Sequence, residues 1–280
     1  MCLIFLSIFT YFYLNLIRNI TYYWNIMEAR LTLVGAGPGD PDLITLKGVK
    51  ALQTADVVLY DALANEALLA YAPETALKVF VGKRAGLHEK QQGEINKMIV
   101  GYAKSMGHVV RLKGGDPYVF GRGHEELQYA VSQGIPASYV PGISSAVAVP
   151  GIAGIPLTKR GYNASFTVLT GTMKDGTLSK DLQLAAKSKA TVVILMGMSK
   201  LPEIVGQFLQ ERGKNEPIAL IQNGSLPKEQ SIVGTLGDIL ERQEKSGICA
   251  PAIIVVGSVV DARIAQKLGT VGYGCAVSCP

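Results

Sequence analysis

Three groups of polar and glycine residues in this 280-residue chain have the chemistry of a ligand site. They follow three apolar runs directly: Asp61 after VVLY, Lys83 after VFVG, and Gly114, Gly115 and Asp116 after VVRLK. A carboxylate and an ammonium group can accept and donate protons, and glycines let a ligand approach the backbone closely. Each group also has a structural alternative, namely a helix cap for Asp61, a solvated basic loop around Lys83, and turn formation for the glycines.

A further glycine-rich turn, GAGPGD, follows the apolar run LTLV. It departs from the dinucleotide fingerprint G-x-G-x-x-G because its third glycine comes one residue early. Pro38 also removes a backbone donor at the point where a phosphate would need one, and the helical pattern resumes only at Ile44. The turn by itself is compatible with an ordinary strand-to-helix connection or with a cofactor loop.

The elements that must position these residues are strands and helices in alternation. The runs LTLVG, DVVLYD, LKVFVG, HVVRLKGG and ASYVPG predict strands, and EINKMIVGYAKSM and GHEELQYAVSQ predict helices between them. Such alternation is typical of a largely parallel sheet with helices on its faces. Because ligands bind beyond the carboxyl ends of the strands in such sheets, we expect the three groups and the glycine turn to share one edge.

The pattern restarts after a stretch rich in glycine and proline. SFTVLTG, TVVILMG, PIALIQNG, EQSIVGT and PAIIVVG predict a second set of strands, and LPEIVGQFLQERG and TLGDILERQEKSG predict helices that end at glycine. We therefore predict two α/β domains. The expected organisation is an N-terminal domain over 27–141, a connecting segment over 142–162, a C-terminal domain over 163–262 and a tail over 263–280.

The first 26 residues differ in composition from the rest. Their apolar part, about 16 residues long, is at the short limit for a membrane span, and it lacks the basic start and cleavage site of a signal peptide. Met27 then begins MEARLTLVGAGPGD, a natural start for a domain. We interpret residues 1–26 as a spurious or disordered extension from a misplaced start codon, with a membrane anchor as the alternative.

Composition narrows the class of partner. The net charge is +5 and no Lys/Arg run is longer than two, which favours an anionic small molecule over nucleic acid. The four cysteines form no C-x-x-C pair, and we interpret them as thiols of a reducing compartment, the cytoplasm. The three histidines form no H-E-x-x-H motif, so no metal site is predicted.

Six motifs carry a family resemblance. In order and spacing, VGAGPGDPDLITLKG, VVLYDALA, VFVGKRAG, VVRLKGGDPYVFGRG, VPGISSA and GIPLTKR resemble the uroporphyrinogen-III C-methyltransferases of the tetrapyrrole methylase superfamily. The resemblance covers about residues 31–260. The glycine turn is shared by the whole superfamily, whereas GKRAG together with RLKGGDPxxFGRG points to uroporphyrinogen III. Two positions depart from the family pattern: Lys159 stands where histidine is usual, and His124 where glycine is usual.

The resemblance implies a fold and a reaction. The fold would be two dissimilar α/β domains with a cleft for S-adenosyl-L-methionine (SAM) between them, in a cytoplasmic homodimer. The reaction would be SAM-dependent C-methylation of uroporphyrinogen III at C-2 and C-7 to precorrin-2, without a metal, for sirohaem or cobalamin biosynthesis. The alternative is another methylase of the superfamily, acting on a later corrinoid precursor or on RNA. No aromatic stacking platform supports an RNA partner.

The resemblance also implies roles for particular residues. Asp61 would be the proton acceptor and Lys83 the proton donor. SAM would be bound by Pro38, Gly114, Gly115, Asp116, Val119, Ser144, Ser145, Met196 and Gly224. A turn that loses a donor to Pro38 suits SAM, since SAM carries no phosphate. The carboxylates of the substrate should be surrounded by positive charge from Lys83, Arg84, Arg111, Lys113, Arg122, Lys159 and Arg160.

Overall fold

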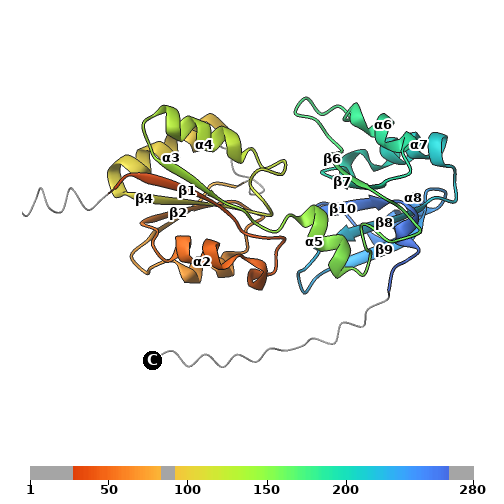
Figure 1. Ribbon diagram of the computed structural model, residues 1–280, viewed down its shortest axis with the longest axis horizontal. Helices are drawn as coiled ribbons and strands as arrows, with labels where there is room; N and C mark the ends of the chain where they lie inside the picture. Colours follow the sequence, from red (N-terminus) through yellow and green to blue (C-terminus); the bar gives the residue numbers. More distant parts are fainter. Residues whose placement is uncertain (1–27, 83–91, 265–280) are drawn as a thin grey trace, which may run out of the picture. The chain divides into compact units, whose positions relative to one another are not determined.

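The computed structural model of the chain describes residues 28–82 and 92–264 (Figure 1). These divide after Ser144 into two compact units, which are described separately below. The extension over residues 1–26, the tail from residue 265 onward and Lys83 lie outside the described residues. Within the described ranges, no helix is both long enough and apolar enough to cross a bilayer.

The first unit is built on a parallel sheet. Its strands are β1 (Arg30–Gly35), β2 (Val57–Tyr60), β3 (Leu77–Phe80), β4 (His108–Lys113) and β5 (Ala137–Val140). They lie in the order β3-β2-β4-β1-β5, and every neighbouring pair is parallel. All five strands predicted for this part of the sequence are confirmed, and so is their parallel arrangement.

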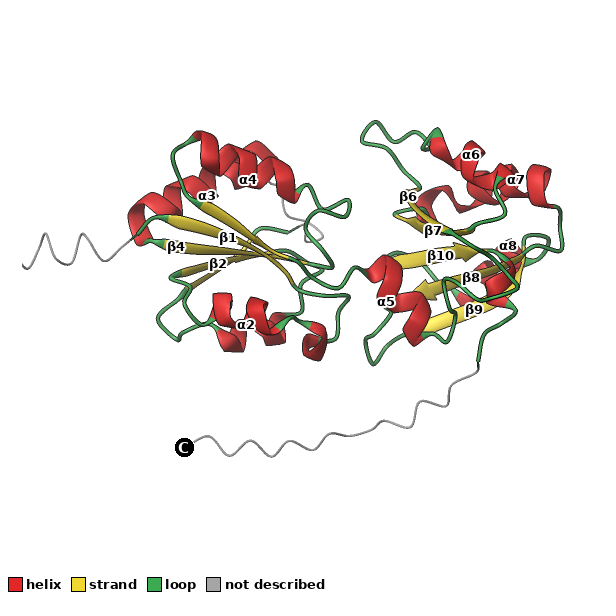
Figure 2. Cartoon of the chain, in the orientation of Figure 1, coloured by secondary structure: helices red, strands yellow, loops and turns green. Residues whose placement is uncertain are grey.

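Helices cover both faces of this sheet (Figure 2). They are η1 (Pro41–Leu43), α2 (Leu46–Leu52), η2 (Glu66–Tyr71), α3 (Gln92–Met106) and α4 (Gly123–Ser132). Leu52 and Leu68 of α2 and η2 pack on one face, whereas Ile99 and Ala130 of α3 and α4 pack on the other. Helix α2 begins two residues later than the apolar pattern suggests, because the Thr45 hydroxyl accepts a hydrogen bond from Gly48 N and caps the helix.

The second unit has a mixed sheet. Its strands are β6 (Phe166–Thr170), β7 (Thr191–Leu195), β8 (Pro217–Gln222), β9 (Gln230–Thr235) and β10 (Ala252–Val256), in the order β6-β7-β10-β8-β9. Only β6 and β7 pair in parallel; the three other pairs are antiparallel. The five strands are those predicted, and the two units are α/β structures of different topology.

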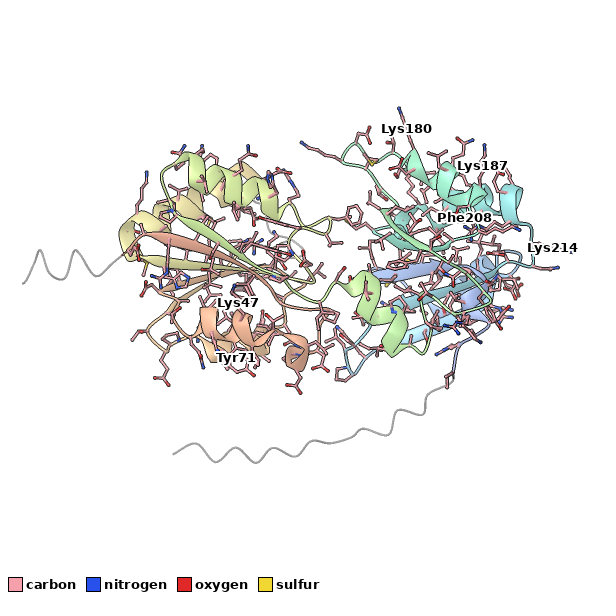
Figure 3. All side chains as sticks on the ribbon, viewed as in Figure 1. Lys47, Tyr71, Lys180, Lys187, Phe208 and Lys214 are labelled. Atoms are coloured by element: carbon pink, nitrogen blue, oxygen red, sulfur yellow. The ribbon has the colours of Figure 1, made fainter. Side chains whose placement is uncertain are left out.

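The helices of the second unit also pack on both faces of its sheet. They are α5 (Ser145–Ile152), α6 (Asp181–Lys187), η3 (Met198–Lys200), α7 (Leu201–Arg212), α8 (Ile239–Ser246) and η4 (Ser258–Val260). Phe208 of α7, labelled in Figure 3, is fully buried with α6 and α8 against one face. Helix α5 lies within the stretch expected to be a connecting segment, and its Val149 packs on the other face. Helices α7 and α8 end at Gly213 and Gly247 as predicted.

Candidate functional site

The predicted site residues of the first unit gather at one edge of its sheet. Because the strands are parallel, the carboxyl ends of β1, β2 and β4 point the same way. The glycine turn follows β1, Asp61 follows β2, and the loop that begins at Gly114 follows β4. The structure therefore brings these three groups to the same edge, as the sequence predicts.

The glycine turn is held by its neighbours through backbone hydrogen bonds. Gly37 and Gly115 exchange two of them, with N to O distances of 3.2 and 2.7 Å. Ala36 N donates to Lys113 O at 2.7 Å, and the Asn65 side-chain amide donates to Gly39 O at 2.8 Å. Since Ala36 N and Gly37 N are occupied and half-buried Pro38 has no N–H, this turn has few donors for a phosphate. That geometry agrees with the argument from the sequence.

Close packing between the loops accounts for two glycines at this edge. A Cβ at Gly114 would lie 2.6 Å from the Cβ of Leu63, in the loop after β2. A Cβ at Gly142, in the loop after β5, would lie 2.2 Å from Gly115 O. Both distances are shorter than real contacts, so the approach of neighbouring backbone requires glycine at these positions.

The carboxylate of Asp116 is buried and joins the loop after β4 to β5. Its Oδ2 accepts hydrogen bonds from Tyr139 Oη at 2.5 Å and from Gly142 N at 3.1 Å, and its Oδ1 accepts one from Tyr118 N at 2.8 Å. Burial, and secondly the bond to Asp116, raise the pKa of Tyr139. Tyr118 stacks on Tyr139 with ring centroids 4.0 Å apart. Asp116 therefore fixes the shape of this loop.

Asp61 stands just beyond β2 with a carboxylate that is fixed at both oxygens. Oδ1 accepts from Leu63 N at 3.2 Å, and Oδ2 accepts from Arg111 Nη2 at 3.3 Å. The side chain remains 23% exposed. The helix-cap alternative does not hold here, because the next helical element begins at Glu66 and is capped by Asn65. An oriented, partly exposed carboxylate is suited to accept a proton from a ligand.

Two basic residues expected around the substrate lie instead in the interior. Arg111 is 2% exposed, Lys113 is 6% exposed, and both form ion pairs with the fully buried Glu126. Burial, followed by the charge of Arg111, lowers the pKa of Lys113, although Glu126 opposes that shift. The expectation that these two cations face substrate carboxylates is wrong, because both lie on the strand face that α3 and α4 cover.

Glu126 is the residue of this region that the sequence reasoning missed. It lies on α4, where the buried residues are Gly123, Glu126 and Ala130. That spacing of three and four residues places the carboxylate on the buried face of the helix. The helical periodicity of GHEELQYAVSQ therefore contained the signal, had the acidic residue at this position been noted.

The second unit places two further predicted residues, Met196 and Gly224, at or near one edge of its sheet. Strands β7 and β8 run in the same direction, since both are antiparallel to β10. Met196 follows β7 and is 53% exposed, and Gly224 lies two residues beyond β8. A Cβ at Gly224 would lie 2.3 Å from the side chain of Val149 on α5, the helix that begins at Ser145. Gly224 and α5 are thus in close contact.

Strained backbone marks the loops that follow strands β4, β7 and β8. Among the described residues other than glycine, positive φ angles of 51 to 68° occur at Phe120, Arg122, Met196, Asn223 and Ser225. Such conformations cost free energy and are retained chiefly where a site needs them. Met196 is a predicted site residue, and Asn223 and Ser225 flank the predicted residue Gly224. Val119, also a predicted site residue, lies beside Phe120 and is 37% exposed, so it presents apolar surface in the loop after β4.

The remaining expected residues have different surroundings. Ser144 is half-buried at the end of the first unit. Arg122 is exposed and pairs with Glu125 at 2.6 Å, and the Lys159 ammonium lies 4.2 Å from the ring centre of Tyr162. Among residues 28–82 and 92–264, no group of three or more His, Cys, Asp or Glu side chains is placed to hold a metal ion.

Known proteins resemble this chain along most of its length. The family described as Tetrapyrrole (Corrin/Porphyrin) Methylases matches residues 30–240. The uroporphyrinogen-III C-methyltransferase of Methanocaldococcus jannaschii is 48% identical over 86% of this chain and 100% of its own length. The siroheme synthase of Actinobacillus pleuropneumoniae is 47% identical over 84% of this chain, which spans about half (48%) of that protein.

Solved structures agree with the sequence relatives. The uroporphyrin-III C-methyl transferase from Thermus thermophilus, complexed with S-adenyl homocysteine, matches with a TM-score of 0.72 and 39% identity. The match covers 83% of this chain and 99% of that one. The two-unit fold, with one parallel and one mixed sheet, is therefore one that a solved methyl transferase shares.

Proposed function

The chain belongs to the tetrapyrrole (corrin/porphyrin) methylase family, and we propose that it methylates uroporphyrinogen III with SAM. Methylation at two pyrrole carbons, C-2 and C-7, gives precorrin-2, a precursor for sirohaem or cobalamin. The observation that carries this proposal is the 48% identity with a uroporphyrinogen-III C-methyltransferase over that protein's whole length. Action on a later corrinoid precursor or on RNA is not favoured, because the similar proteins reported above bear the names of this methyltransferase and of siroheme synthase.

SAM supplies an electrophilic methyl group, and the residues at the two sheet edges have the chemistry to bind the rest of the molecule. Val119 in the first unit and Met196 in the second are each exposed and apolar, a property that suits a residue in contact with an adenosine. The glycine turn has few free amide donors, but SAM carries no phosphate and does not need them, so this turn is compatible with SAM. The set of residues proposed for SAM is Pro38, Gly114, Gly115, Asp116, Val119, Ser144, Ser145, Met196 and Gly224. Asp116 would contribute mainly by holding its loop, given its three internal hydrogen bonds.

The proton that leaves the substrate goes to Asp61 in this proposal. When the pyrrole carbon, which already carries a side chain and no hydrogen, takes the methyl group, the ring gains a positive charge, and loss of a proton from elsewhere in the methylated macrocycle restores neutrality. The carboxylate of Asp61 is oriented by Leu63 N and Arg111 and is partly exposed, so it has a lone pair available for the proton. Lys83 is the proposed proton donor and lies outside the described residues.

Surface cations can bind the carboxylates of the substrate. Arg122, Lys159 and Arg160 are exposed and remain accessible, in contrast to Arg111 and Lys113. Exposed guanidinium groups suit the acetate and propionate groups of uroporphyrinogen III. We further propose a cytoplasmic homodimer, for which sedimentation velocity of the purified protein is the direct test. The free thiol of Cys249 is consistent with a reducing compartment.

The test is an anaerobic incubation of the full chain with SAM and uroporphyrinogen III, analysed by mass spectrometry and absorbance. We expect two methyl additions to the porphyrinogen, with S-adenosylhomocysteine as the second product. Boiled protein and a reaction without SAM are the controls. Binding of SAM without methylation of uroporphyrinogen III would show that the substrate is wrong. Failure to bind SAM would refute the methyltransferase assignment altogether.

A further inference from the structure

Helix α4 carries a fully buried carboxylate, that of Glu126, which is linked to Asp61 only through Arg111. Three donors converge on Glu126 Oε1: Gln92 Nε2 at 3.0 Å, Lys113 Nζ at 3.1 Å and Arg111 Nε at 3.3 Å. Among the described residues, Glu126 Oε2 has no hydrogen-bond partner. Lys113, Arg111 and Glu126 therefore form a buried group of two cations and one anion, with Asp61 as the second anion.

Stability alone does not explain this group. Val109 occupies the same face of β4 and is apolar, as the core between the sheet and α3 and α4 requires. Buried ion pairs are rarely more stabilising than apolar residues of the same size, because removing each charge from water is costly. Ionised residues at three neighbouring core positions therefore point to a role other than stabilisation.

Arg111 connects Glu126 to Asp61 through a guanidinium that is fixed on several sides. Its Nε donates to Glu126, and its Nη1 donates to Leu59 O at 3.3 Å and to Leu112 O at 2.9 Å. Its Nη2 donates to Asp61 Oδ2 at 3.3 Å. Because the guanidinium is planar, these bonds fix both its position and its rotation. Glu126 is thus one of the groups that fix the guanidinium to which Asp61 Oδ2 is bonded.

We propose that Glu126 is a positioning residue for the proton acceptor Asp61, acting through Arg111. This inference rests on the proposed function, in which Asp61 takes the proton that the methylated macrocycle releases. Glu126 holds the guanidinium in place and balances one of the two buried cations. Without that carboxylate, the guanidinium of Arg111 would lose its partner at Nε and could turn away from Asp61, and Asp61 Oδ2 would lose its fixed direction.

The experiment measures kcat, the KM for SAM and the affinity for S-adenosylhomocysteine in Glu126→Gln, which retains the shape of the side chain and removes its charge. We expect kcat to fall by about tenfold or more, with KM and affinity within about twofold of wild type. Glu125→Gln is the matched control, since Glu125 is the exposed neighbour on the same helix. That variant should retain the kcat of the wild type.

A double-mutant cycle separates positioning from a general loss of structure. If Glu126 acts through Asp61, adding Glu126→Gln to Asp61→Asn should change kcat by less than about twofold. Additive losses in the cycle, or an unchanged kcat in Glu126→Gln, would overturn the proposal. A wild-type enzyme without turnover would instead overturn the proposed function, and this inference with it.

A second variant keeps the test decisive if Glu126→Gln does not fold. Arg111→Lys retains the positive charge but loses the planar fork that connects Glu126 with Asp61. We expect the same fall in kcat with SAM affinity preserved, and no further loss in the Asp61→Asn background. Normal turnover in Arg111→Lys would show that Asp61 needs only a nearby charge, and would refute the positioning role.

Discussion

Replacing Asp61 by asparagine tests the proposed proton acceptor most directly. Asparagine has nearly the same size and its carbonyl oxygen can still accept from Arg111, but it cannot take up the proton. We expect kcat to fall by about 10² to 10⁴-fold, the usual contribution of a general base. That loss corresponds to roughly 3 to 5 kcal/mol in the activation barrier. SAM affinity should be unchanged.

The same substitution should affect stability only slightly. At 3.3 Å, the attraction between Asp61 and Arg111 is about 5 kcal/mol at an effective dielectric constant of 20. Most of this is offset by the cost of desolvating the ions, and Arg111 remains paired with Glu126 in the variant. We therefore expect a loss of about 1 to 2 kcal/mol in the free energy of unfolding, which lowers Tm by roughly 2 to 8 °C.

Strand β2 offers a matched control for this prediction. Asp56 precedes the strand and Asp61 follows it, so the same substitution can be made at both ends. Asp56 Oδ2 accepts from His108 N at 2.7 Å, at the amino end of β4 and away from the candidate site. Asp56→Asn should lower Tm while kcat stays normal. Wild-type turnover in a folded Asp61→Asn variant would refute the assignment of Asp61.

Three further outcomes are expected. Asp116→Ala should weaken SAM binding by more than about tenfold in calorimetry, because the loop after β4 loses the carboxylate that bonds it to Tyr139 and Gly142, and a charge-assisted hydrogen bond is worth roughly 1.5 to 3 kcal/mol. Unchanged affinity would remove Asp116 from the site. Arg212→Ala should lower the free energy of unfolding by about 2 to 4 kcal/mol in urea titrations while kcat is retained. The buried guanidinium donates to the carbonyl oxygens of Ala185 and Ala186 in the last turn of α6 and of Ala190 just after it, and these bonds are lost. Burial lowers the pKa of His108 below 6.5, so the contribution of neutral His108 to the free energy of unfolding is fully present above pH 6.5 and is lost as the pH falls through the folded-state pKa. Urea midpoints that are equal at about pH 7.5 and at about pH 5 would contradict this expectation.

The spacing of the apolar residues was sufficient to predict where the strands and the longer helices lie. Runs such as DVVLYD and TVVILMG alternate with helical patterns, and glycine after the last periodic residue predicted the ends of α7 and α8 correctly. The sequence predicted the relative direction of the strands less completely. The parallel first sheet follows from βαβ alternation, but β10 pairs antiparallel with both β7 and β8. That choice depends on which strands become neighbours, and no local pattern encodes it.

The sequence by itself determined the family, the strands and the placement of Asp61, the glycine turn and the loop after β4 at one edge. The family follows from the resemblance of the motifs, whereas the strands and their shared edge follow from local periodicity and from the rule for parallel strands. Tertiary structure alone decided the burial of Arg111 and Lys113, because charged residues on a strand face water unless a helix covers that face. It also decided the partner of both cations, since Glu126 meets them only when α4 packs on the face of the sheet to which both side chains belong. Long-range packing sets the surroundings of each charge, and those surroundings determine its chemistry.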